Sequence, residues 1–255
     1  KRNPGDIYAE WSVNEKVALE VAAGAAYAGV RSMVTMKQVG LNVASDPLMS
    51  LAYIGVKGGM VVVVADDPGP ISSQTEQDTR TFAGYARLPV FDPVSPEEAF
   101  EMIQDAFELS ERLGTPVLFR PTTRVCHGYA PIEVGARTRE PGAGTFEKDS
   151  RWVIFPRLSY TSHKAIEERL PVLAGELSSY RFNVVEEVRG GMLEHGPARA
   201  VTRGIATGGV TYAYARESLS VLGADCRVLK VGTPHPFPAD LAERFLGGID
   251  EVLVL

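Results

Sequence analysis

Short apolar runs alternate with segments of helical periodicity along the first half of the chain. Each apolar run is between five and eight residues long, which is typical of a strand buried on both faces. Strands that alternate with helices in this way form a parallel sheet that the helices cover on both faces. We therefore predict an α/β fold with strands near residues 31–37, 59–66, 88–92 and 116–121 and helices near 13–29, 44–54, 75–85 and 96–113.

The helix over residues 96–113 has the clearest sequence boundaries. Ser95 is suited to cap its first turn, Pro96 can occupy the first helical position, and Glu98 stands at the third. Gly114 follows the last periodic residue, as is common at helix ends. These residues are structural punctuation, and we assign them no function.

The second half of the chain has a different organisation. Residues 122–151 carry several prolines and glycines with no sustained period, which indicates a linker, and a charged helix follows near residues 162–177. We predict a parallel-sheet α/β domain over 1–130, a linker with a helix over 131–200 and a smaller α/β domain over 201–255. The smaller domain should alternate strand and helix through residues 203–207, 209–222, 227–231, 238–246 and 251–255.

Glu15 is the first candidate functional residue. It opens a helix whose next fourteen residues are mostly alanine, glycine and valine, so another backbone or a flat cofactor ring could pack closely against that helix. A structural role is also open, because Ser12 and Glu15 have the spacing of a capping box. Capping and catalysis can be two roles of this one carboxylate.

The segment 66–80 is the second candidate. It leaves the carboxyl end of an apolar strand, where parallel sheets place their ligand crevices. Arg80 offers a fork-shaped cation that could hold a carboxylate, and an ion pair with Glu76 four residues earlier is an equally open alternative. The short polar donors of this segment are Ser72, Ser73, Gln74 and Thr75.

The segment 36–42 follows the preceding strand and should face the same crevice. We interpret it as a loop in which Gly40 lets the backbone approach a ligand, although an ordinary strand-to-helix turn explains this glycine equally well. Lys37, Gln38 and Asn42 can supply polar contacts to that ligand.

Composition limits the function classes. The formal net charge of the 255 residues is −6, which argues against nucleic acid or an anionic membrane as partner. No apolar run approaches the roughly 18 residues that a membrane span needs. Cys126 and Cys226 are too few and too far apart for an iron–sulfur cluster, which takes about four thiolates, so we expect buried small side chains in a reducing cytoplasm.

Four strings carry a family resemblance: EWSVNEKVA at residues 10–18, MKQVGLNVASDP at 36–47, ADDPGP at 65–70 and SSQTEQDTR at 72–80. In this order they resemble the large subunits of indolepyruvate:ferredoxin oxidoreductases, within the thiamine diphosphate-dependent 2-oxoacid:ferredoxin oxidoreductases. Residues 204–255 resemble the transketolase C-terminal-like domain of the same family, and the resemblance implies that residues 1–130 form its parallel-sheet, pyrimidine-type thiamine-diphosphate-binding domain.

The resemblance implies roles for the candidate residues. Glu15 would lie beside N1′ of the cofactor's aminopyrimidine and share a proton with it, which activates C2 of the thiazolium ring. Arg80 would hold the carboxylate of the 2-oxoacid. We expect cofactor contacts from Gly40, Leu41 and Asn42 and substrate contacts from Lys37, Gln38, Ser72, Ser73 and Gln74.

The resemblance also implies cofactors and partners. The enzyme would convert an aryl 2-oxoacid and coenzyme A to an acyl-coenzyme A and pass electrons to ferredoxin. Thiamine diphosphate would be held with Mg²⁺ by a diphosphate-binding domain of the same or a partner chain, so we expect no metal ligand here. The 4Fe–4S clusters would lie elsewhere, with a small subunit completing a homo-oligomer or heterotetramer.

The ends of the chain suggest an excised fragment. It starts KRNP without methionine and finishes VLVL, and it lacks the strand and loop with which family members begin. We therefore expect the fragment alone to be inactive. The alternative is a non-catalytic α/β scaffold or interaction module, which gains support if Glu15 and Arg80 lie on opposite faces of the sheet.

Overall fold

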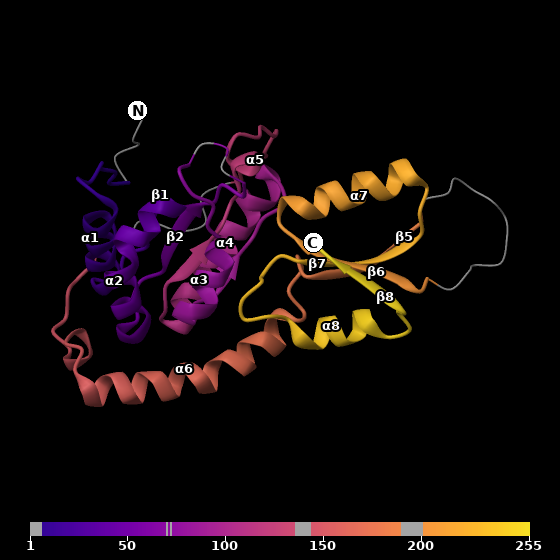
Figure 1. The fold of residues 1–255 in the computed structure, drawn as a ribbon. Coiled ribbons are helices and arrows are strands. Elements are labelled where there is room, and N and C mark those ends of the chain that lie inside the picture. Colours follow the sequence, from indigo (N-terminus) through magenta and orange to yellow (C-terminus); the bar gives the residue numbers. More distant parts are fainter. Residues whose placement is uncertain (1–6, 70, 72, 136–143, 190–200) are drawn as a thin grey trace.

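The computed structural model describes residues 7–69, 71, 73–135, 144–189 and 201–255, and it contains two sheets with their own helices (Figure 1). The first sheet is wholly parallel, which confirms the predicted fold class. Its order is β1-β2-β4-β3, so the chain passes from β2 to the edge strand β3 and then reverses direction across the sheet to place β4 between them. The strands are β1 (Ser32–Lys37), β2 (Met60–Ala65), β3 (Val90–Phe91) and β4 (Val117–Phe119).

Helices cover both faces of the first sheet. Alternate residues of β2 divide between two cores: Met60, Val62 and Val64 pack with three helices on one face, and Val61 packs with α4 on the other. This alternation follows from the two-residue period of a strand. The helices of the first face are α1 (Glu15–Tyr27), α2 (Gln38–Ile54) and α3 (Thr79–Ala86), and α4 spans Pro96–Leu113.

The small residues of α1 serve packing within the fold. Ala22, Ala23 and Ala26 are buried in the core that α1 shares with α2 and β1, so they receive protein side chains. The predicted capping box is wrong: Asn14 is the N-cap, and its side chain accepts a hydrogen bond from Val17 N at 2.9 Å. Glu15 therefore occupies the first helical position.

Two other helix starts differ from the prediction. The segment interpreted as a loop at 36–42 is the end of β1 and the first turns of α2, which begins at Gln38. Conversely, α3 begins only at Thr79, because the Asp78 carboxylate caps it by accepting from Arg80 N. The boundaries of α4 are as predicted, with Ser95 and Gly114 as its caps.

The second sheet is smaller and mixed, with the order β5-β7-β6-β8. β6 pairs in parallel with β7 and β8, whereas β5 runs antiparallel to β7. The sequence analysis does not predict β5, because its VVEEV run is short and half charged. The strands are β5 (Val184–Val188), β6 (Arg203–Gly208), β7 (Cys226–Val231) and β8 (Glu251–Val254), and the helices are α7 (Val210–Leu222) and α8 (Ala239–Leu246).

The two units meet at β3 and at the segment after β7. Val90 N donates to His235 O at 2.9 Å and Asp92 N donates to Gly232 O at 2.8 Å. A long helix, α6 (Pro156–Leu177), runs beside both units (Figure 1), and the short helices α5 (Thr123–Cys126) and η1 (Ser150–Trp152) precede it. The junction therefore borders the carboxyl edge of the first sheet.

The described helices include none that combines the length and the apolar character needed to cross a membrane.

Candidate functional site

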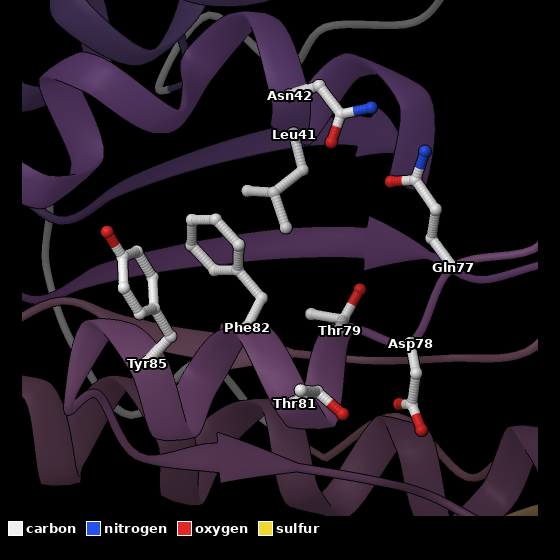
Figure 2. A pocket seen from close by; sticks show the side chains of 8 residues that line it. All are labelled: Leu41, Asn42, Gln77, Asp78, Thr79, Thr81, Phe82 and Tyr85. Carbon is white, nitrogen blue, oxygen red and sulfur yellow. The ribbon is translucent and has the colours of Figure 1, made fainter.

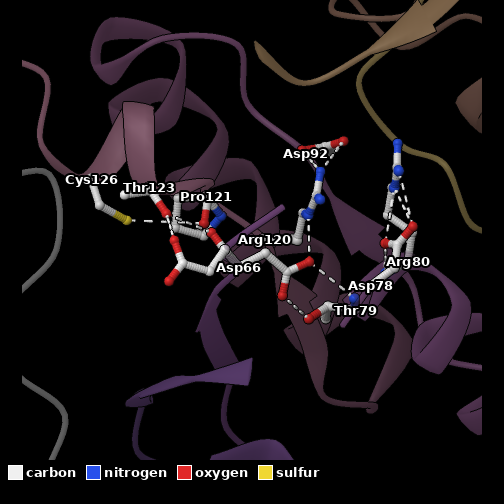
Figure 3. A network of polar contacts seen from close by, with 10 residues as sticks. Asp66, Asp78, Thr79, Arg80, Asp92, Arg120, Pro121, Thr123 and Cys126 are labelled. Atoms are coloured by element: carbon white, nitrogen blue, oxygen red, sulfur yellow. Dashed lines mark hydrogen bonds and ion pairs between the residues drawn. The ribbon is translucent and has the colours of Figure 1, made fainter. Parts of the chain in front are cut away.

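Three neighbouring strands of the first sheet are each followed directly by a charged residue. Asp66 follows β2, Arg120 follows β4 and Asp92 follows β3, so a cation lies between two carboxylates (Figure 3). Arg120 Nε donates to Asp66 Oδ2 at 2.6 Å, and Nη1 lies 3.2 Å from both Asp92 oxygens. None of the three side chains is more than 5% exposed. The cluster is thus a buried ion network.

Further hydrogen bonds tie this network to the segments around it. Asp66 accepts from the backbone N of Thr79 at 3.0 Å and from the Thr79 hydroxyl, which fixes the start of α3. The adjacent Asp67 accepts from the hydroxyls of Thr123 and Ser73, with the Ser73 bond at 3.0 Å. Hydrogen bonds and ion pairs therefore engage the carboxylates at this part of the edge.

Asp92 extends the network into the second unit. A Cβ placed on Gly209 would lie 2.6 and 2.8 Å from the two Asp92 oxygens, so the carboxylate occupies the space beside the glycine that is the N-cap of α7. Burial raises the pKa of Asp92 to about 6, although the neighbouring Arg120 and Arg80 charges act to lower it. The Asp92 side chain therefore lies between residues of both units.

Glu15 has very different surroundings. Its side chain is partly buried, yet within the described residues its carboxylate has no hydrogen-bond or ion-pair partner. It packs against Gly40 in the first turn of α2: a Cβ there would lie 2.5 Å from Glu15 Cγ and 2.8 Å from Oε1. The first turn of α2 has neither a side-chain cap nor an acidic residue of its own. The carboxylate thus lies at the positive ends of two helices.

A cavity of about 520 Å³ opens between α2 and α3, next to the turn that contacts Glu15 (Figure 2). Leu41 projects towards Phe82, while Asn42 and Gln77 stand at the more polar end. The cavity therefore combines apolar walls with a few polar groups, as small-molecule sites commonly do. Its lining residues are Leu41, Asn42, Gln77, Asp78, Thr79, Thr81, Phe82 and Tyr85.

The structure brings several predicted site residues together. Gly40 contacts Glu15, and the next two residues, Leu41 and Asn42, line the cavity. Gln38 is 1% exposed and its Nε2 donates to Thr75 O at 3.2 Å, so it fastens α2 to the segment before α3. Its Oε1 has no partner in the part of the chain that the structure describes.

The remaining described residues predicted to bind substrate are not gathered around the cavity. Lys37 Nζ lies 3.7 Å from Asp67 Oδ2, and Ser73 bonds to the same carboxylate. Gln74 is exposed, and Ser72 lies outside the described residues. The structure therefore places Lys37 and Ser73 against Asp67 and assigns neither of them a ligand.

Arg80 pairs with Asp78 instead of Glu76, because Glu76 precedes the start of α3 and has no helical spacing to it. Arg80 Nε lies 3.0 and 3.1 Å from the two Asp78 oxygens, and Nη2 lies 2.9 Å from Oδ2. Asp78 also lines the cavity. No hydrogen bond or ion pair joins Arg80 to Glu15 among the described residues, but their helices α3 and α1 pack on the same face of the sheet.

The sequence analysis missed Asp66, Asp67, Asp92 and Arg120 as candidates. In the sequence, a charged residue directly follows each of the apolar runs that form β2, β3 and β4. Only the strand order shows that these charged side chains are neighbours in the fold. The expectation that both cysteines are buried is wrong for Cys126, which is exposed.

The donor set can be tested against the cofactor that the resemblance implies. The Glu15 carboxylate is partly buried, has no partner in the described residues and packs against Gly40, which precedes the cavity-lining Leu41 and Asn42, so it suits a ring nitrogen that exchanges a proton with it. No group of three or more His, Cys, Asp or Glu side chains in the described ranges could hold a metal ion. The residues present thus fit the aminopyrimidine, and the position of the metal stays a prediction.

Comparison with known proteins decides the family. Residues 5–151 match a family model described as "Pyruvate flavodoxin/ferredoxin oxidoreductase, thiamine diP-bdg". The chain belongs to this family. The predicted resemblance is therefore confirmed at the level of the oxidoreductase family, and the match covers the whole first sheet and the candidate site.

Curated relatives of the family match nearly the whole chain. "Indolepyruvate oxidoreductase subunit IorA" of Methanothermobacter thermautotrophicus is 47% identical over 250 residues, and that of Pyrococcus abyssi is 43% identical over 256 residues. Each alignment covers 98% of this chain but only 39% and 38% of the relative. The chain spans about two-fifths of the length of these oxidoreductase subunits.

A solved structure has a similar fold. It is "2-oxoglutarate:ferredoxin oxidoreductase from Magnetococcus marinus with 2-oxoglutarate, coenzyme A and succinyl-CoA bound", with a TM-score of 0.65 and 16% identity. The match covers 95% of this chain and 49% of that one. At this identity the likeness supports the fold of both units.

Proposed function

We propose that this chain forms the aminopyrimidine side of the thiamine diphosphate site in an enzyme that oxidatively decarboxylates aryl 2-oxoacids such as indolepyruvate. The observation that carries the proposal is the Glu15 carboxylate, which is partly buried, unpartnered in the described residues and packed against the first turn of α2. The family description and the names of the curated relatives support the same reading.

Glu15 would act by sharing a proton with N1′ of the aminopyrimidine. Bound thiamine diphosphate supplies an activated carbon that can add to the 2-oxo group and accept the electrons of the departing carboxylate. The N-termini of α1 and α2 both face the Glu15 carboxylate, and no described cation competes for it, so it is available to a ring nitrogen. Leu41 and Asn42 would complete this wall of the site.

The substrate would lie between α2 and α3. Arg80 belongs to α3 but is not among the residues that line the cavity, so it would bind the substrate carboxylate at the cavity's border. Asp78 engages its Nε and Nη2 and leaves Nη1 available for this contact. Leu41, Phe82 and Tyr85 line the 520 Å³ cavity and offer apolar surface to an aryl group. Polar contacts would come from Lys37, Gln38, Ser72, Ser73 and Gln74.

The complete reaction needs components beyond these residues. An aryl 2-oxoacid anion and coenzyme A would give acyl-coenzyme A, carbon dioxide, a proton and two electrons, with ferredoxin as the electron acceptor. The electrons would pass through 4Fe–4S clusters elsewhere in the enzyme. A diphosphate-binding domain would hold the cofactor with Mg²⁺, and a small subunit would complete a homo-oligomer or heterotetramer.

Replacement of Glu15 by glutamine tests the proposal. In the complete enzyme, Glu15→Gln should lower the rate of C2-proton exchange on bound cofactor by roughly 10²–10⁴-fold, the scale of lost acid–base assistance. The free energy of unfolding should change by less than about 1 kcal/mol, because Asn14, and not Glu15, caps α1. Both quantities can be measured on one preparation, by quenched deuterium exchange and by chemical denaturation.

Glu20→Gln is the matched control. Glu20 is exposed and lies five residues further along α1, which turns it about 140° away from Glu15 around the helix. Its replacement should leave C2-proton exchange within twofold of the unaltered enzyme. Normal exchange in Glu15→Gln would contradict the catalytic assignment and favour the non-catalytic scaffold.

A further inference from the structure

Gly40 is buried in the first turn of α2, where its missing side chain leaves room for Glu15. A Cβ at Gly40 would come within 2.5 Å of Glu15 Cγ, 2.8 Å of Oε1 and 2.9 Å of Cδ. Real Cβ atoms essentially never approach other heavy atoms so closely, so a side chain there must displace Glu15. The contact involves the carboxylate end of the side chain, which is the end that would carry the chemistry.

The backbone conformation at this position does not require glycine. Gly40 lies inside a regular helix and is absent from the residues with positive φ, so alanine could adopt the same backbone angles. Glycine within a helix also lowers stability relative to alanine, because it loses more conformational freedom on folding. The close approach of Glu15 is therefore the reason that the structure offers for a glycine here.

We propose that Gly40 is a positioning residue that sets where the Glu15 carboxylate lies, and that it acts on catalysis only through Glu15. This inference rests on the proposed function of Glu15 and replaces the expected direct contact between Gly40 and the cofactor. The displaced group is a partly exposed side chain without partners in the described residues, so it can rotate away at little cost to the fold. A side chain at residue 40 should therefore change the position of the Glu15 carboxylate without lowering the free energy of unfolding.

Gly40→Ala in the complete enzyme tests the inference, with Gly24→Ala as the matched control. Gly24 is also helical, but it is exposed and a Cβ there would meet nothing within 4 Å. Both variants should keep or raise the thermal midpoint, because alanine favours the helix. Only Gly40→Ala should slow C2-proton exchange, by roughly 10–100-fold, the scale expected when a catalytic group is misplaced by about 1 Å.

A second readout does not depend on activity. Crystal structures of the two cofactor-free variants should show the Glu15 carboxylate displaced by about 1 Å or more in Gly40→Ala and unmoved in Gly24→Ala. An unmoved carboxylate, or exchange within twofold of the unaltered enzyme in Gly40→Ala, would overturn the positioning role.

The outcomes separate this inference from the proposed function. Slow exchange in Glu15→Gln with normal exchange in Gly40→Ala would refute only the role of Gly40. Normal exchange in Glu15→Gln would refute the catalytic role of Glu15 itself, whatever Gly40→Ala does. A fall in the thermal midpoint of Gly40→Ala by more than that of Gly24→Ala would mean that the glycine serves packing, and would also overturn the inference.

Discussion

At the carboxyl edge of the first sheet, the carboxylates of one part are buried and paired, whereas the carboxylate at the other part is partly exposed and has no partner among the described residues. Beyond β2, β4 and β3, Asp66 and Asp92 are buried on either side of Arg120 and are held by hydrogen bonds. Near the carboxyl end of β1, Glu15 packs against Gly40 of α2, is partly exposed and has no hydrogen-bond or ion-pair partner among the described residues. A carboxylate whose charge is already balanced holds elements together, whereas one left unpaired is available to exchange a proton. This difference in pairing distinguishes the structural cluster of Asp66, Arg120 and Asp92 from the candidate catalytic group Glu15 at the same edge of the sheet.

The comparison also shows why a shifted pKa is an incomplete guide to function. Burial raises the pKa of Asp92 to about 6, and such shifts are often used to locate active sites. Here the carboxylate with the shifted pKa lies between Arg120 and Gly209, the N-cap of α7, where it joins two units of the fold. Packing and unsatisfied hydrogen-bonding capacity point to Glu15 instead.

Loss of Arg120 should have the largest effect on stability. Arg120→Met removes the cation between two buried carboxylates, and breaking a buried ion pair in this way costs about 3–5 kcal/mol of unfolding free energy. Arg112→Met is the control, since its pair with Glu176 has side chains 52% and 50% exposed and should contribute at most about 1 kcal/mol. Chemical denaturation measures both. Equal losses in the two variants would mean that the buried cluster is no more than an ordinary surface pair.

The next effect is a pH dependence that belongs to Asp92. Its pKa is raised from 3.8 to about 6 in the fold, so the folded state retains a proton that the unfolded chain releases. The stabilisation from this group is complete below about pH 4 and is lost as the pH rises through 6. The unaltered protein should therefore lose on the order of 3 kcal/mol relative to Asp92→Asn between pH 4 and pH 7.

Denaturation at a series of pH values gives this difference directly, because the contributions of all other groups cancel to first order. A difference between the two proteins that stays constant with pH would show that Asp92 is ionised throughout, and that Arg120 outweighs the effect of burial.

The smallest stability effect is expected at Arg80, whose charge also reaches Asp92. Its ion pair with Asp78 is about one-third exposed, so Arg80→Lys should change the unfolding free energy by less than about 1 kcal/mol. Lysine cannot reproduce the planar fork, so the KM for the 2-oxoacid should rise severalfold with little change in kcat. Steady-state kinetics of the complete enzyme decide this, with Arg112→Lys as control, and an unchanged KM would remove Arg80 from the substrate site.

Local sequence signals predicted the first sheet well. The caps of α4 lie within a few residues of the helix they bound, so Ser95 and Gly114 could be read directly. The start of α2 was misjudged because Gly40 and Asn42 are typical of loops, and only tertiary contacts such as Gln38 to Thr75 show the helix extending back to residue 38. β5 was missed because it exists through its pairing with β7, a partner about forty residues away.

The candidate site likewise contains residues that local sequence indicates and residues that only the tertiary fold brings together. Glu15 could be identified from the residues around it, although Asn14 rather than Ser12 turned out to cap the helix. The buried ion network could not be predicted, because Asp66, Arg120 and Asp92 become neighbours only through the strand order β2-β4-β3. The role of Gly40 likewise depends on which helix α1 packs against.

The helix α6 has a mechanical consequence. With 22 residues it is about 33 Å long, and it is attached at two points. His163 Nδ1, in its third turn, lies 3.1 Å from the Tyr53 hydroxyl of α2, and Arg244 of α8 donates to the O atom of the C-cap Ser178 at 3.1 Å. It works as a spacer with a fixed rotational phase between the two attachments. Adding a single residue would lengthen that spacer by only about 1.5 Å but would turn one attachment by roughly 100° relative to the other, so its phase constrains the molecule more tightly than its length.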